Sequence, residues 1–307
     1  PTRDRADCLE KTLRQLCSYR RTDFNIIVSD NCSSDNTMFV VKKINDSRIK
    51  YVRTTKRLSL SDNWNFALNQ VEYGWVTIVG DDDGLLIDEA FCLIEEAIGR
   101  NIELVRTLPI QYSWPGVHPR FPNGGAYLPK KRSDAVVYSK TLLNKAENLK
   151  IGYMQLPLIY NGGIVTFDLL KKVRNADGVF FPNRNPDLYL GVRLAQESDK
   201  YLFSSKIVSI NGASSHSNGF SKHSEHGDYL AKDSPSEKYL SENNKLPFGN
   251  MPDPLPRNLT ATFLESYLWA YQQKYGKKLE LKYFYLICRI LIRSKQMAIR
   301  ETFLWCI

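Results

Sequence analysis

Hydrophobic positions along the first hundred residues alternate between two periods. Leu9, Leu13 and Leu16 recur at helical spacing and predict a helix over about residues 6–19. The stretch FNIIVSDN, residues 24–31, is a short apolar run that ends in polar turn residues, which is typical of a buried strand. Repeated strand–helix units of this kind predict an α/β fold, with a mainly parallel sheet and helices on both of its faces.

The alternation continues to about residue 212. Further strands are expected over residues 48–54, 75–83, 102–107, 162–167 and 200–212. Further helices are expected over residues 61–71, capped by Ser61 or Asp62, and over 87–99, 139–149 and 186–198. Residues 109–131 interrupt the pattern with proline, glycine and aromatic side chains, which predicts a long irregular lid or binding loop.

The last ninety residues have a different composition. Residues 216–257 are rich in Ser, Gly, Asn, His and Pro, which indicates a flexible linker, and residues 258–307 are expected to be helical. The net charge of +9 is concentrated there, because the stretch 274–300 holds eight basic residues and one acidic residue. One helix is expected here with a basic stripe and an apolar face. The basic stripe consists of Lys278, Lys282, Arg289, Arg293 and Arg300, and the apolar face of Phe284, Ile287 and Leu291.

Two interpretations of this basic helix stay open. It could lie at the surface of an anionic membrane, or it could pack on the domain with a solvated basic face. The rest of the chain is nearly neutral, which argues against a nucleic-acid-binding protein. No run of eighteen apolar residues appears, the opening PTRDRAD is unlike a signal peptide, and the six cysteines are scattered without a CxxC pair. A reducing, cytoplasmic location is therefore expected.

Three adjacent aspartates, residues 81–83, follow an apolar run and precede a glycine. Like charges this close need a compensating charge or exposure to water. In parallel α/β sheets ligands bind at the carboxyl ends of the strands, where both these aspartates and SDN, residues 29–31, are expected. A divalent cation bound together with a diphosphate would supply the charge, since Mg²⁺ and Mn²⁺ prefer oxygen ligands. The simpler alternative, an acidic surface turn, suffices for the aspartates alone.

Four motifs in order give a more specific signal. PTRDR, VSDNCSSDNT, LSLSDNWNFALNQV and WVTIVGDDDGLLID resemble the family-2 glycosyltransferases, over roughly residues 1–215. The resemblance implies a GT-A-type fold, with a nucleotide-binding half over about 1–107 and an acceptor-binding half over about 108–215. It also implies transfer from a nucleotide-diphospho-sugar, with a UDP-sugar as the most frequent donor, and a first strand upstream of residue 1. Asp4 stands where the family usually has Asn.

Residue roles follow from the same resemblance. The positions matched to donor binding are Thr2, Arg3, Asp30, Asp35, Asn63, Trp64 and Asp81. Alignment on Asp88 makes Asp82 the ligand of Mn²⁺ or Mg²⁺, flanked by Asp83. His216, in SSHSNG, is a further candidate ligand of the metal or diphosphate, with a loop histidine of no special role as the equal alternative. His223 and His226 have weaker claims.

The catalytic base of the family matches Asp187, which follows Pro186 where a Glu is usual. An N-cap aspartate is the alternative for this position. As a base it would take the proton of an acceptor hydroxyl during a direct, inverting displacement. Asn161, Gly162 and Gly163 are expected to line the acceptor site together with residues 153–155, and Trp114 would either stack on a sugar ring or pack internally.

The resemblance therefore predicts an inverting, metal-dependent glycosyltransferase that acts on a glycan or lipid-linked acceptor in cell-surface polysaccharide biosynthesis. The basic helix would then bring it to the inner face of the membrane. A sugar nucleotidyltransferase is the first alternative, but it needs a glycine-rich phosphate loop near the amino terminus, where this sequence has none. A catalytically inactive carbohydrate- or membrane-binding relative is the second.

Overall fold

A computed structural model describes residues 1–118, 120–130, 133–217, 242, 251, 258–280 and 283–292. Its helices are α1 (Ala6–Cys17), α2 (Thr37–Ile44), α3 (Leu60–Leu68), α4 (Ile87–Gly99), α5 (Ser139–Glu147), α6 (Phe167–Lys172), α7 (Pro186–Glu197), α10 (Leu259–Tyr275), α11 (Tyr283–Ile292) and the 3-10 turn η1 (Tyr153–Gln155). Its strands are β1 (Ile26–Asp30), β2 (Ile49–Arg53), β3 (Trp75–Val76), β4 (Gly84–Leu85), β5 (Leu104–Arg106), β6 (Ile110–Ser113), β7 (Gly125–Tyr127), β8 (Ala135–Tyr138), β9 (Gly163–Thr166), β10 (Lys200–Phe203) and β11 (Ser209–Ala213).

The strands form three sheets with helices packed around them. β1 pairs with β2, a second sheet has the order β3-β9-β5-β10-β8, and a third has the order β4-β11-β6-β7. Pairing is parallel in β1–β2, β5–β10 and β6–β11 and antiparallel in the other described pairs. The α/β class is confirmed, but the sheets are more mixed than the predicted mainly parallel arrangement. The difference arises because β9 runs against both of its neighbours and because β6 and β7 form a hairpin.

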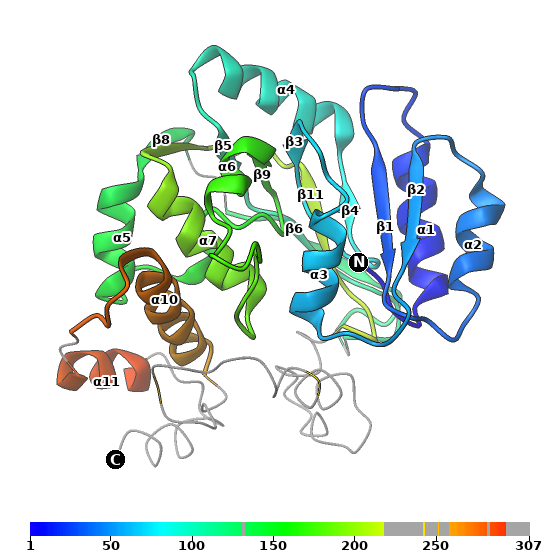
Figure 1. Cartoon of the computed structure of the whole chain (residues 1–307). Coiled ribbons are helices and arrows are strands. Elements are labelled where there is room, and N and C mark those ends of the chain that lie inside the picture. The colour runs from blue at the N-terminus through cyan, green and yellow to red at the C-terminus, as the bar shows by residue number, and fades with distance from the viewer. Residues whose placement is uncertain are drawn as a thin grey trace.

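The amino-terminal layer follows the predicted pattern. α1 and α2 pack on one side of β1 and β2, and α3 lies on the other side (Figure 1). Leu9 and Leu13 of α1 and Val28 of β1 meet Val41 of α2 in one apolar cluster. α3 begins earlier than expected, because the cap is Ser59: its hydroxyl accepts a 3.1 Å hydrogen bond from the amide of Asp62. The cap was therefore placed wrongly at Ser61 or Asp62.

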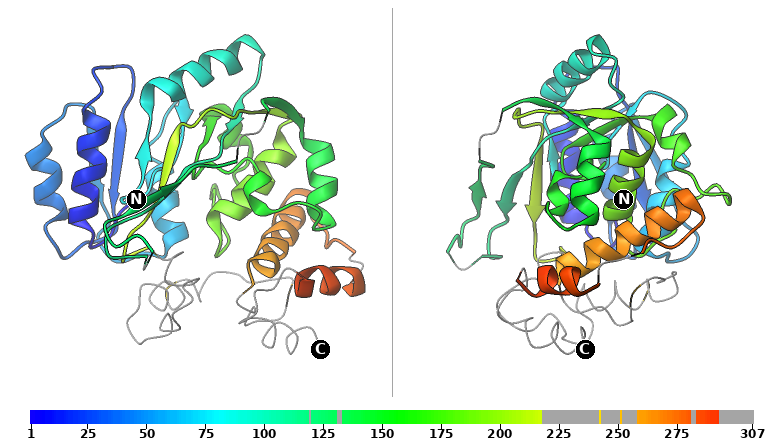
Figure 2. Two further views of the ribbon diagram at one scale, coloured as in Figure 1. Left: turned by 180° about the vertical axis from the view of Figure 1, so that it is seen from behind. Right: turned by 90° about the vertical axis from the view of Figure 1, so that its left-hand side faces the viewer.

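The largest apolar core lies in the second half of the chain. α7 is buried along most of its length and packs against α5 and α10 (Figures 1 and 2). Phe263, Leu264 and Tyr267 of α10 share this core with Tyr189 and Leu190 of α7. The carboxyl-terminal helix α10 is therefore built into the core rather than appended to it.

The irregular loop expected over residues 109–131 is only partly present, because the paired strands β6 and β7 lie within it, at the edge of the molecule (Figure 2). The described residues between the two strands form no regular element. Aromatic packing joins this connection to β7: the rings of Phe121 and Tyr127 meet edge to face at 5.3 Å, and a Cβ on Gly125 would lie 2.7 Å from the ring of Phe121.

The carboxyl-terminal region also differs from the single basic helix that was predicted. Lys278 lies in the connection between α10 and α11. Among residues 286–292 of α11, Leu286 and Ile290 are buried, whereas Ile287 and Leu291, expected on the apolar face, are half-buried. Lys282, Arg293 and Arg300 lie outside the described residues, as do most of the predicted linker, His223 and His226. Among the described helices none is long and apolar enough to cross a membrane.

Candidate active site

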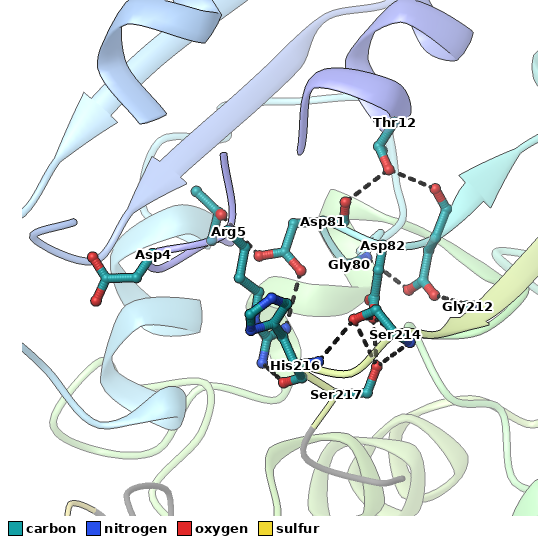
Figure 3. Close-up of polar contacts among 12 residues, drawn as sticks. Asp4, Arg5, Thr12, Gly80, Asp81, Asp82, Gly212, Ser214, His216 and Ser217 are labelled. Carbon is teal, nitrogen blue, oxygen red and sulfur yellow. Dashed lines mark hydrogen bonds and ion pairs between the residues drawn. The ribbon is translucent and has the colours of Figure 1, made fainter. Parts of the chain in front are cut away.

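The three aspartates form a buried loop between β3 and β4, and side chains from two other segments hold its main chain (Figure 3). The hydroxyl of Thr12 in α1 contacts the carbonyl oxygens of Asp81 and Asp83 at 2.9 and 2.8 Å. The indole N–H of Trp114 donates to the carbonyl of Asp82 at 3.0 Å. Trp114 thus packs internally, and the loop is fixed before any ligand is considered.

Asp81 is neutralised by residues from the amino-terminal motif. Its carboxylate accepts hydrogen bonds from the hydroxyl of Thr2 at 2.8 Å and from the guanidinium of Arg5 at 3.0 Å. Arg5 also donates to the carbonyl oxygen of His216, so one side chain joins the aspartate loop to the segment after β11. This brings the predicted residues Thr2, Asp81 and His216 together, with His216 exposed at the rim (Figure 3).

Asp82 is held through only one of its carboxylate oxygens. Oδ2 accepts hydrogen bonds from the hydroxyl of Ser214 at 2.6 Å, from the amide of Ser214 at 3.2 Å and from the hydroxyl of Ser217. Oδ1 accepts none from any residue that the structure describes. Both carboxylate oxygens of Asp81 and of Asp83 accept hydrogen bonds, so we call Oδ1 of Asp82, which has no described donor, the open carboxylate oxygen of the loop.

Asp83 has no free carboxylate oxygen. Oδ1 accepts from the amide of Gly212 at 2.7 Å, and Oδ2 accepts from the amide of Gly80 at 2.8 Å. Burial, followed by the charge of Asp82, raises the pKa of Asp83 to about 7, and hydrogen bonds from Gly212, Tyr160 and Gly80 oppose that rise. Asp83 therefore anchors the loop to β11.

A divalent cation fits this loop only if most of its ligands come from elsewhere. Within the described residues, no group of three or more His, Cys, Asp or Glu side chains is arranged to hold a metal ion. Oδ1 of Asp82 can supply one hard oxygen ligand, and a Mg²⁺-type ion commonly takes its remaining ligands from water and substrate phosphates. The residues thus suit an ion bound together with a diphosphate.

The predicted base-binding end lies at the carboxyl end of β1. Thr2 pairs in parallel with Asp30, whose side chain is fully buried. Asp30 accepts hydrogen bonds from the amide of Ser33 at 2.8 Å and from the hydroxyl of Tyr51 at 2.5 Å, and burial, together with this contact, raises the pKa of Tyr51. These bonds fix the carboxylate of Asp30 at the strand end.

The other predicted donor residues occupy varied positions. Asp35 accepts from the amide of Thr37, at the start of α2, at 3.0 Å and from the amide of Ala6, at the start of α1, at 2.9 Å, so it joins two helix starts. Arg3 forms a 2.6 Å ion pair with Glu242.

Asn63 and Trp64 lie on α3. Asn63 accepts a 2.8 Å hydrogen bond from the hydroxyl of Ser29. Trp64 is buried in the core, with its ring 5.5 Å from the rings of Tyr160 and Phe181. Of these two residues, Asn63 is thus the one that contacts β1 directly.

Asp187 lies in the first turn of α7 and is half-buried. The N-cap of that helix is Asn185, so the alternative of Asp187 as the cap does not hold. Its carboxylate acts electrostatically on the guanidinium of Arg106 and on the phenol of Tyr153, and burial chiefly raises the pKa of that phenol. Asp187 therefore interacts electrostatically with Tyr153, in the segment expected to line the acceptor site.

That segment turns sharply before β9. Asn161 and Gly162 have φ of 57° and 94°, and a Cβ on Gly162 would lie 2.6 Å from Oγ1 of Thr107. A Cβ on Gly163 would lie 1.4 Å from the carbonyl oxygen of Leu158, so only glycine fits there. Gly162 and Gly163 thus shape the turn, and Asn161 is the member of the trio with a side chain to offer.

Comparison with known proteins agrees with this arrangement. The family model "Glycosyl transferase family 2" matches residues 1–134. This amino-terminal part of the chain is therefore similar to the family 2 glycosyl transferases. A protein of Campylobacter jejuni named GalNAc(5)-diNAcBac-PP-undecaprenol beta-1,3-glucosyltransferase is 36% identical over 100 residues, which span 32% of this chain and 32% of that protein.

Solved structures share the fold of this chain. S. aureus TarS 1-349 in complex with UDP-GlcNAc matches with a TM-score of 0.54 and 16% identity, over 95% of this chain and 78% of that one. The mannosyltransferase PcManGT from Pyrobaculum calidifontis, in complex with GDP-Man and Mn²⁺, matches with a TM-score of 0.50 and 15% identity, over 98% and 76%. At this identity the likeness shows the fold, and the predicted GT-A-type architecture is confirmed.

Several residues of the candidate site were not singled out by sequence. Arg5 stands in the PTRDR motif, and Ser214 and Ser217 flank His216, so a signal for these three existed in motifs already noted. Thr12 and Arg106 gave no signal, because an ordinary helix and an ordinary strand carry them. Their importance depends on contacts with residues distant in sequence.

Proposed function

We propose that the chain is an inverting glycosyltransferase that moves a sugar from a nucleotide-diphospho-sugar to an acceptor hydroxyl. The observation that carries the proposal is the aspartate loop, in which Asp81 and Asp83 are fully hydrogen-bonded and Oδ1 of Asp82 accepts no hydrogen bond from any described residue. The proposal treats residues 1–215 as the catalytic unit, with its nucleotide half ending near residue 107.

The donor would bind along the carboxyl ends of the first strands. Asp30 and Thr2 would face the nucleoside, with Arg3, Asp35 and Asn63 nearby, and Asp81 would approach the ribose. Trp64 would act from the core, through its packing on α3. A UDP-sugar remains the first donor to try, since TarS 1-349 is described in complex with UDP-GlcNAc.

Asp82 would hold a divalent cation, with His216 at the rim as a second ligand of the ion or of the diphosphate. Such an ion, when bound, neutralises charge on the leaving diphosphate. Asp83 would contribute by anchoring the loop, because both its oxygens are already bonded. PcManGT, described with Mn²⁺ and GDP-Man, supports Mn²⁺ as the first ion to test.

Asp187 would act as the general base. As the acceptor oxygen attacks the anomeric carbon, its proton passes to the carboxylate of Asp187, and the bond between that carbon and the diphosphate oxygen breaks with its electron pair going to the diphosphate. One displacement of this kind inverts the anomeric configuration. Asn161 and the turn at Gly162 and Gly163 would position the acceptor.

The acceptor is proposed to be a glycan or lipid-linked glycan of the cell surface. The name of the Campylobacter jejuni relative includes a diphospho-undecaprenol glycan, and this supports a lipid-linked acceptor as the first class to test. Action at the cytoplasmic face of a membrane would follow, with the basic carboxyl-terminal region as its contact.

The test is a transfer assay on the full chain with Mn²⁺. UDP-glucose, UDP-N-acetylglucosamine and GDP-mannose are each offered with octyl β-glycosides of glucose, galactose, N-acetylglucosamine and N-acetylgalactosamine, and released nucleoside diphosphate is measured. Asp187→Asn should lower the rate about 10²- to 10⁴-fold, the usual contribution of a general base. Asp168→Asn, an exposed carboxylate of α6, is the control. Equal rates in the Asp187 variant and wild type, or no transfer in any combination, would contradict the proposal.

A further inference from the structure

Arg106 is a fully buried cation at the end of β5. Removing a guanidinium from water is expensive unless hydrogen bonds and charge compensate for it. Within the described ranges it forms no ion pair, and its hydrogen-bond partners are three main-chain carbonyls and, at 4.0 Å, the sulfur of Met154. The strand β5 lies between β9 and β10 in its sheet, so this cation is surrounded by strands of the proposed acceptor half.

The three carbonyl partners of Arg106 belong to one segment. Nε and Nη2 donate to the carbonyl of Met154 at 3.4 and 3.3 Å, and Nη1 donates to the carbonyls of Tyr160, at 3.3 Å, and Asn161. Met154 lies in η1, and Asn161 begins the turn before β9. One side chain therefore ties both ends of the acceptor-side segment, residues 153–162, to β5.

Arg106 also interacts electrostatically with ionisable groups to which it is not hydrogen-bonded. Burial lowers the pKa of Arg106 to about 10, and Tyr201, Tyr153 and Asp187 oppose this, so the group stays protonated at neutral pH. Asp187 and Arg106 also act in opposite senses on the pKa of Tyr153, which burial raises.

We propose that Arg106 is a positioning residue, which fixes the acceptor-side segment 153–162 through its hydrogen bonds to the carbonyls of Met154, Tyr160 and Asn161. The inference rests on the proposed function, since that function gives the segment its task of lining the acceptor site. It assigns a role in catalysis to a residue that touches neither substrate, because Arg106 acts through the main chain that would line the acceptor site.

The chain offers a matched control for this role. Arg48, at one end of the nucleotide half, likewise donates to main-chain carbonyls, those of Cys17, Tyr19 and Arg21, and it pairs with Asp46. Arg48→Met removes comparable bonds from a site far along the sequence from segment 153–162. It reports what a loss of structural bonds alone does to the rates.

The experiment compares Arg106→Met, Arg106→Lys, Arg48→Met and wild type, using the donor and octyl glycoside that wild type turns over fastest. Arg106→Met should lower kcat/KM for the acceptor about 10- to 100-fold, as misplacement of reacting groups does, while the affinity for the nucleoside diphosphate stays within about twofold. Arg106→Lys, which keeps the charge and some bonds, should recover part of the loss. Arg48→Met should leave the acceptor kcat/KM unchanged.

Hydrogen–deuterium exchange gives a second readout on the same proteins. Amides of residues 153–162 should exchange faster in Arg106→Met than in wild type, and not in Arg48→Met. If Arg106→Met does not fold, Arg106→Lys carries the comparison. Wild-type kcat/KM in the Arg106 variants, or a parallel loss of nucleotide affinity, would overturn the inference. If wild type transfers no sugar, the proposed function fails, and unchanged exchange in Arg106→Met would refute the positioning role as well.

Discussion

The amide of Gly212 donates a 2.7 Å hydrogen bond to Oδ1 of Asp83, and its α-carbon lies so near Asp82 that a Cβ would come within 1.8 Å of the Asp82 carbonyl oxygen. β11 and the aspartate loop are therefore in direct backbone contact. Residues far apart in sequence are locked together, so the shape of the loop depends on a strand that follows it by more than a hundred residues.

Gly212→Ala should separate these two backbones. The added Cβ meets main-chain atoms that cannot rotate away, so the free energy of unfolding should fall by about 1–3 kcal/mol, as overpacking does. Urea denaturation measures this fall. Gly99→Ala is the control, because nothing lies within 4 Å of a Cβ at Gly99. Equal stability of Gly212→Ala and wild type would show that the contact is looser than the structure has it.

Thr12→Val should weaken the loop without changing the volume of the side chain. It removes the hydroxyl that contacts the carbonyls of Asp81 and Asp83, and leaving such buried groups unpaired costs about 1–3 kcal/mol. The affinity for a nucleoside diphosphate should fall with it, because Asp82 loses its fixed position. Thr141→Val, at an exposed position of α5, is the comparison. A stable variant with wild-type affinity would mean that the hydroxyl does not shape the site.

Asn65 of α3 should stabilise the segment that leads into α7. Its side chain accepts from the amides of Phe180 and Phe181, at 2.9 and 3.1 Å, and donates to the carbonyl of Phe181 at 3.3 Å. Asn65→Asp keeps the two acceptor bonds and Asn65→Leu loses all of them. Thermal unfolding should therefore rank wild type above Asn65→Asp and Asn65→Leu last. A reversed order of the two variants would contradict this assignment.

The pair Asp46 and Arg48 should make stability depend on pH. Hydrogen bonds from Arg48 hold the pKa of Asp46 well below its usual range. A carboxylate with a lowered pKa in the folded state stabilises that state above its unfolded pKa of about 4, and the contribution is lost as pH falls. Asp46→Asn should be less stable than wild type at pH 7, with a gap that narrows toward pH 3. A gap that stays constant across this range would exclude the ionic contribution.

Local pattern was enough to predict elements whose periodicity is clear. The helix at residues 87–99 has the predicted bounds, and the SDN and GDDD motifs lie at the carboxyl ends of β1 and near β3, as expected. α2 was missed because four apolar residues in succession, Met38 to Val41, conceal its helical period. The hairpin was missed because its proline and glycine residues resemble those of an irregular loop.

The site residues that belong to a sequence motif were predictable. Those whose role depends on contacts with residues distant in sequence were not. PTRDR and GDDDG could be matched to a family. The two motifs are in contact in the structure, because Thr2 and Arg5 donate hydrogen bonds to Asp81. The separate tasks of the three aspartates depend on partners such as Ser214 and Gly212, which are 132 and 129 residues away from the residues they bind. No local pattern encodes a pairing over that distance.

The open oxygen of Asp82 is the centre of the account, and calorimetry tests it most directly. UDP, GDP and dTDP are titrated into wild type, Asp82→Asn and the surface control Asp168→Asn, with Mn²⁺ and with EDTA. One nucleotide should bind with Mn²⁺, and EDTA and Asp82→Asn should each weaken this binding at least tenfold, about 1.4 kcal/mol, while Asp168→Asn should not. Binding that is equally tight in EDTA and in Asp82→Asn would contradict a metal role of Asp82.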